Sequence, residues 1–184
     1  MQIDYEGDGQ LNRIVSWFKG RVHSINICLE NGLLEEGLVL IYSGIDTLGF
    51  LSAPPDVSGA NRHTFLSWCD KYFLQYVRSA ENESVSAFDI YAARCGMLHT
   101  SMPITELERK GKAHQVWYRF KDTAGANFMM ATPQRPMGLD IENLAVAFKF
   151  SGIMFIEEIN QDRSGFQIAD DRAQNILRWG RLIP

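Results

Sequence analysis

The sequence predicts a mainly α-helical protein, an up-and-down helical bundle with a small β-hairpin insertion. Apolar residues recur at steps of three and four over long stretches, as on the buried face of a helix. Short β-prone runs lie together within about 113–130. The 184 residues, 46% hydrophobic and 22% charged, are typical of one folded domain. We expect a single domain over 1–184, with the bundle core at about 10–100 and 139–180.

Local signals divide the helical part of the chain. The predicted helices span about 10–29, 33–53, 62–79, 86–102, 140–160 and 169–179. Gly32 follows the first as a C-terminal stop, and Pro54 ends the second. Ser86 and Asp89 form a capping box for the fourth, and Asp140 caps the fifth. The aromatic stripe of the third helix is expected to pack in the core.

The remaining segments read as turns and a hairpin. Residues 108–112 are predicted to form a charged turn and 162–165 another turn. Between them, 116–120 and 127–130 are β-prone runs separated by turn residues, so we expect them to pair as a hairpin.

Composition excludes several classes of protein. The net charge of −4 argues against a surface coated with positive charge for unspecific nucleic-acid binding. We see no secretory signal and no apolar stretch of membrane-spanning length. The chain has three cysteines, and no two of them have the CxxC spacing. Neither a disulfide framework nor a zinc site is therefore indicated. We therefore expect a cytoplasmic protein without metal or cofactor.

The segment from Arg94 to His99 carries the candidate chemistry. Arginine binds phosphate through two parallel hydrogen bonds and stays charged at physiological pH, while histidine transfers protons near neutrality. Cutting RNA without a metal requires a base, an acid and a positive group that stabilises the phosphorus transition state. The hypothesis is that His99 acts as general acid or base and Arg94 stabilises the charge, leaving 2′,3′-cyclic phosphate and 5′-hydroxyl ends.

The spacing of Arg94 and His99 poses a geometric problem. Positions i and i+5 of a straight helix lie about 140° apart around the axis, so both side chains cannot face one phosphate. Either the helix unwinds near His99, or two copies of the chain place their motifs across a shared cleft.

The R-x4-H spacing in a late helix of a bundle resembles the HEPN superfamily, many of whose members are ribonucleases. The resemblance implies a homodimer that cuts RNA, acts in toxin–antitoxin or antiviral defence, and is held in check by an antitoxin or inhibitor protein. The residue after the arginine is often polar in that family. Here it is Cys95, so we expect one positioning hydrogen bond of the family to be missing.

Three residues of the second predicted helix are supporting candidates. A carboxylate inside an apolar helix is costly unless it is paired, so Asp46 is expected to bind Arg94 or His99. Tyr42 and Ser43 could add hydroxyl groups to the same site.

Two other interpretations of the motif stay open. The bundle could be a non-catalytic interaction or nucleotide-binding module, with Arg94 and His99 in a dimer interface or on a phosphate ligand. Alternatively, both residues could simply interact with the last carbonyl groups and the dipole of their helix.

Overall fold

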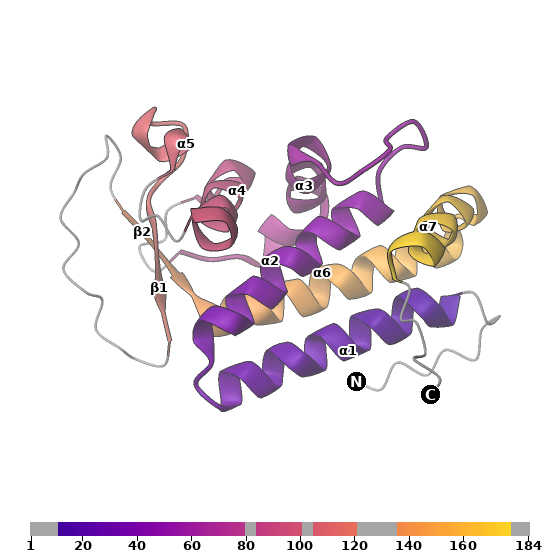
Figure 1. The fold of residues 1–184 in the computed structure, drawn as a ribbon, viewed down its shortest axis with the longest axis horizontal. Coiled ribbons are helices and arrows are strands. Elements are labelled where there is room, and N and C mark those ends of the chain that lie inside the picture. Colours follow the sequence, from indigo (N-terminus) through magenta and orange to yellow (C-terminus); the bar gives the residue numbers. More distant parts are fainter. Residues whose placement is uncertain (1–10, 80–83, 101–104, 121–135, 178–184) are drawn as a thin grey trace.

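The computed structural model describes residues 11–79, 84–100, 105–120 and 136–177 (Figure 1). It is mainly helical with a small two-stranded sheet, which confirms the predicted fold class. In chain order the elements are α1 (Leu11–Glu30), α2 (Leu34–Leu51), α3 (Arg62–Trp68), the π-helical turn η1 (Cys69–Phe73), the 3-10 turn η2 (Leu74–Tyr76), α4 (Ala87–Cys95), the π-helical turn η3 (Gly96–Thr100), α5 (Glu106–Arg109), β1 (Val116–Arg119), β2 (Met137–Asp140), α6 (Ile141–Gln161) and α7 (Arg163–Ile176).

Several helix boundaries lie where local signals predict them. Gly32, just after α1, has a φ of 74°, a conformation that glycine adopts at little cost. The Ser86 hydroxyl accepts the Asp89 N–H at 3.2 Å, and the Asp89 carboxylate accepts the Ser86 N–H at 2.8 Å. Asp140 accepts the Asn143 N–H at 2.9 Å at the start of α6. Both predicted caps are therefore confirmed.

Other boundaries differ from the prediction. The helix expected over 62–79 is α3 followed by the wider turn η1 and the tighter turn η2, although its aromatic stripe is buried as expected. The turn expected at 162–165 is instead the start of α7, because Asp162 caps this helix by accepting the Ser164 N–H at 3.0 Å. The charged turn expected at 108–112 begins inside the short helix α5.

The two strands of the small sheet, β1 and β2, pair in parallel and not as an antiparallel hairpin. β1 is a strand, as predicted, but it runs parallel to β2, with Val116 opposite Met137 and Arg119 opposite Asp140. Parallel neighbours require a crossover connection rather than a tight turn. Residues 127–130, the predicted partner of β1, lie outside the described residues, and β2 was not predicted as a strand.

The core lies among the long helices. Figure 1 shows α1, α2 and α6 stretched across the view, with α3 and α4 seen nearly end-on over α2. α2 packs against α1, α3, α6 and α7. Gly152 of α6 allows a close crossing with α1, since a Cβ there would lie 2.1 Å from the Phe18 ring. In the part of the chain that the structure describes, no helix has the length and apolar character needed to cross a membrane.

Arg172 of α7 holds the segment that follows α2. The residue is 9% exposed, and its guanidinium donates to the carbonyl oxygens of Phe50, Ala53, Pro54 and Val57 at 2.6–2.9 Å. A cation at the C-terminal end of a helix also interacts favourably with the helix dipole. Arg172 thus ties the end of α2 and the segment after it to α7 through four backbone carbonyl groups.

Candidate functional site

Arg94 of α4 binds Asp46 of α2. The Nε and Nη2 atoms of Arg94 both donate to Oδ2 of Asp46, at 3.0 and 2.6 Å. The two side chains are 16% and 20% exposed, so the ion pair is largely shielded from water. The expectation that Asp46 finds its partner in Arg94 or His99 is confirmed for Arg94.

The pair keeps the guanidinium charged and fixed in position. Burial by itself would lower the pKa of Arg94, but the hydrogen bond and negative charge of Asp46, together with smaller contributions from Cys95, outweigh it, and the pKa is raised. Hydrogen bonds between charged partners are roughly twice as strong as neutral ones. Arg94 therefore sits at the end of α4 as a permanent cation with little freedom to move.

The backbone changes its helical type after Cys95, the residue that follows Arg94. α4 ends at Cys95 and continues as the π-helical turn η3, which contains His99 and packs against α2. A π-helical turn is wider than an α-helical turn, so each of its residues advances by a smaller angle around the axis. The angle between positions 94 and 99 is therefore smaller than the 140° of a straight α-helix. The side chain of His99 lies outside the described part of the structure.

The two hydroxyl candidates on α2 contact other elements. The Tyr42 hydroxyl lies 2.7 Å from the Tyr118 hydroxyl of β1. Tyr42 is completely buried, and burial raises its pKa well above the ordinary value. Ser43 accepts a hydrogen bond of 3.0 Å from Nη1 of Arg21 in α1. The structure thus joins Asp46 to Arg94, whereas it ties Tyr42 to the sheet and Ser43 to α1.

Arg21 of α1 also contacts α2, although the sequence did not indicate it as a candidate residue. Its guanidinium is half-buried between the Ser43 hydroxyl and the Trp17 ring, whose centroid is 5.3 Å away. Burial lowers its pKa. The i, i+4 spacing of Trp17 and Arg21 indicates that they share a helix face, but the contact with α2 depends on tertiary packing.

His114 is a second residue whose partner only the structure reveals. Its ring Nδ1 lies 3.0 Å from Oδ1 of Asp89, and its backbone N–H donates to the same oxygen at 2.7 Å. Since Asp89 also caps α4, the pair fastens the segment before β1 to the start of α4. No pattern in the sequence around His114 indicates that Asp89, 25 residues earlier in the chain, is its partner.

Cys95 follows Arg94 and is partly exposed, with a free thiol. Cys69 is also a free thiol but is completely buried, and burial raises its pKa well above the ordinary value. Within the described ranges, no group of three or more His, Cys, Asp and Glu side chains is placed to hold a metal ion.

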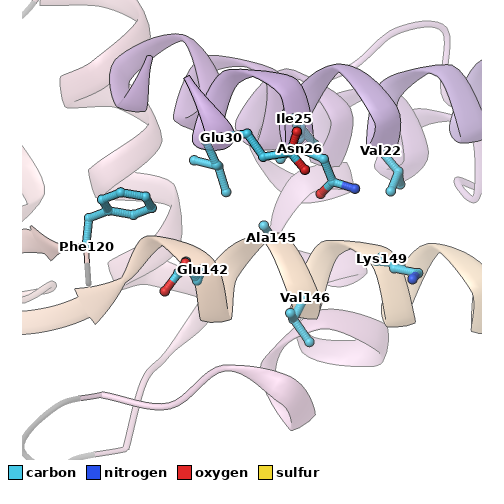
Figure 2. Close-up of a pocket in the computed structure, with 10 residues that line it drawn as sticks. Val22, Ile25, Asn26, Glu30, Phe120, Glu142, Ala145, Val146 and Lys149 are labelled. Atoms are coloured by element: carbon cyan, nitrogen blue, oxygen red, sulfur yellow. The ribbon is translucent and has the colours of Figure 1, made fainter. Parts of the chain in front are cut away.

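A groove of about 290 Å³ lies between α1 and α6, and Tyr42, Asp46 and Arg94 are not among the residues that line it (Figure 2). Figure 2 shows Glu30 and Asn26 of α1 facing Glu142 and Lys149 of α6, with Ala145 on its floor. Two carboxylates and one ammonium group make this groove a poor place for a phosphate, because like charges repel. The candidate site is therefore the junction of α2, α4 and η3.

Comparisons of the chain with protein-family models, with curated proteins and with solved structures gave no match.

Proposed function

We propose that this chain is a metal-independent endoribonuclease, with Arg94 stabilising the transition state and His99 transferring a proton. The observation that carries the proposal is the junction of α4 and η3. There the shielded guanidinium of Arg94 is anchored by two hydrogen bonds to Asp46, and Cys95 alone separates Arg94 from the π-helical turn that contains His99. π-helical turns inside helices occur frequently at functional sites.

The reaction is a transfer of the phosphoryl group within the RNA strand. The 2′-oxygen loses its proton to a base and forms a bond to phosphorus, while the bond from phosphorus to the 5′-oxygen breaks. An acid gives the leaving 5′-oxygen a proton, so the products are a 2′,3′-cyclic phosphate and a 5′-hydroxyl group. His99 serves one of the two proton transfers, and Arg94 balances the negative charge that accumulates on the phosphate oxygens.

Asp46 has a positioning role in this proposal. It holds the guanidinium through one of its oxygens and raises the pKa of Arg94 against the effect of burial. A preorganised charge needs no rearrangement at the moment of reaction, and this is the main advantage of a fixed catalytic cation.

RNA cleavage in EDTA tests the function. We expect the wild-type protein to cut single-stranded RNA and to leave cyclic phosphate ends, as identified by mass spectrometry of the fragments. His99→Ala is expected to lower the cleavage rate by roughly 10²–10⁴, the usual contribution of one general acid or base. Arg94→Lys keeps the charge but loses the planar donor fork, so it should also cut slowly.

His63→Ala is the matched control, because His63 is an exposed histidine of α3 outside the site. It should cut at the wild-type rate. Equal cleavage by wild type and His99→Ala would contradict the proposal, as would cleavage that EDTA abolishes. If no variant cuts any RNA, the alternative of a non-catalytic interaction or nucleotide-binding module takes its place.

The resemblance to the HEPN superfamily supports the biological part of the proposal. On this basis the protein would act as a homodimer in toxin–antitoxin or antiviral defence, with RNA as substrate and an antitoxin or inhibitor protein as regulator.

A further inference from the structure

Three polar residues of α2 are partly exposed: Ser43, Asp46 and Thr47, here called the α2 strip. Two guanidinium groups from different helices reach this strip. Arg21 of α1 donates to Ser43, and Arg94 of α4 donates to Asp46. Residues three apart on a helix have Cβ atoms about 5–6 Å apart, so the two arginines are anchored at neighbouring points.

The positive charge of Arg21 is not balanced by a carboxylate as the charge of Arg94 is, among the residues that the structure describes. Among the described residues, the guanidinium of Arg21 contacts the neutral Ser43 hydroxyl and the Trp17 ring, but no carboxylate. A partly buried cation without an acidic partner is unfavourable, and the lowered pKa of Arg21 reflects that cost. With Asp46 as the one acid on the strip, the two arginines leave a net positive charge there, in a chain whose net charge is −4.

We propose that Arg21 and Arg94 together form a binding site for the phosphodiester backbone of single-stranded RNA on the α2 strip. Arg94 holds the phosphate that reacts, and Arg21 binds a neighbouring phosphate of the same strand. The choice of RNA as ligand rests on the proposed ribonuclease function. The pairing of the two cations rests on the contacts of Ser43 and Asp46 alone.

The test measures binding of a 2′-O-methyl RNA oligonucleotide, which lacks the reactive 2′-hydroxyl, at several salt concentrations. Each phosphate contact to a single strand contributes about −0.7 to the slope of log K against log salt. We expect Arg21→Gln to reduce this slope by about 0.7 and to weaken binding at low salt. Arg21→Lys, which keeps the charge, should retain most of the slope.

Lys149→Gln is the matched control, because it removes one positive charge from the groove between α1 and α6. It should leave the slope unchanged. The melting temperature supplies a second readout. Since Arg21 has no carboxylate partner within the described ranges, Arg21→Gln should leave the melting temperature unchanged or raise it. A lower melting temperature with an unchanged slope would assign Arg21 a structural role and overturn the proposal.

The remaining outcomes separate this site from the catalytic function. Binding that depends on Arg21, without cleavage of unmodified RNA, supports the phosphate site and refutes the ribonuclease. If the wild-type protein cuts RNA but Arg21→Gln does not change the salt slope, the phosphate site is refuted. The proposed ribonuclease function is then unaffected. No binding of the oligonucleotide by the wild type also overturns the site.

Discussion

At the scale of single residues, the contact between Arg94 and Asp46 is the main feature of the candidate site. A carboxylate in an otherwise apolar helix requires a partner, and α4 supplies it from 48 residues further along the chain. The contact is largely shielded, and both hydrogen bonds end on the same oxygen. Such a pair costs more when one partner is removed than it contributes as a whole.

Asp46→Ala is therefore expected to lower the free energy of unfolding by about 2 kcal/mol, because it leaves a shielded guanidinium without its anion. Urea unfolding followed by circular dichroism measures this change. The same variant should cut RNA more slowly, since Arg94 loses its anchor.

Glu158→Ala is the matched control. Glu158 forms an ion pair with Lys71 on the surface, where the two side chains are 50% and 57% exposed. Exposed pairs contribute at most about 1 kcal/mol, because water and salt screen the charges. If Asp46→Ala costs no more than Glu158→Ala, the pair between α2 and α4 is not the anchor described above.

At the scale of elements, helix crossings depend on glycines of α2 and α6. Gly49 lies against the backbone of α3, where a Cβ would stand 2.7 Å from the Thr64 carbonyl oxygen. Backbone atoms cannot rotate away as the tip of a side chain can. The position of α3 over α2, and with it the buried aromatic stripe, therefore depends on the absence of a side chain at residue 49.

Gly49→Ala is expected to destabilise the protein by about 1–3 kcal/mol, the usual cost of adding atoms to a packed core. Thermal and urea unfolding measure the effect.

Gly20→Ala makes the same chemical change in α1, where no described atom outside the adjoining helix backbone lies within 4 Å of the new Cβ. It should stabilise the protein by about 0.5–1 kcal/mol, because alanine loses less backbone entropy in a helix. Two alanine variants with the same effect would show that α2 and α3 are not in close contact at Gly49.

The elements themselves were largely predictable. Capping boxes, the Gly32 stop and the apolar spacing are local signals, so they predicted the long helices of the described chain correctly. The wider turns η1 and η3 were not predictable, because no residue pattern selects a π-helical turn over an α-helical one. Only the packing of the flanking segments does so.

At the scale of the whole molecule, α2 connects three parts of the fold through polar contacts. Ser43 binds Arg21 of α1, Tyr42 binds Tyr118 of β1, and Asp46 binds Arg94 of α4. The candidate site thus forms only when α2 and α4 have assembled, and the contact of Arg21 with Ser43 also requires α1.

The turn η3 leads to a prediction about how copies of the chain cooperate. Because it narrows the angle between positions 94 and 99, we expect one chain to hold both functional residues. Mixing inactive Arg94→Gln and His99→Ala proteins in equal amounts should then restore no RNA cleavage, as measured in EDTA with a labelled oligonucleotide.

Recovery of activity in the mixture would contradict this expectation. It would show that the reacting phosphate lies between an arginine of one copy and a histidine of the other, the second of the two geometric solutions. The wild-type protein at the same total concentration serves as the reference for full activity.

By itself, the sequence determined the mainly helical class, most helix boundaries, the buried aromatic stripe and the need of Asp46 for a partner. These features depend on periodicity, capping and the cost of burying a charge, all of which act within a few turns of the chain. Only the tertiary structure decided that Asp46 binds Arg94, that β1 runs parallel to β2, and that Arg21 and His114 have partners. Each of these contacts joins residues far apart in sequence, and such pairs are selected by the packing of whole elements rather than by any local pattern.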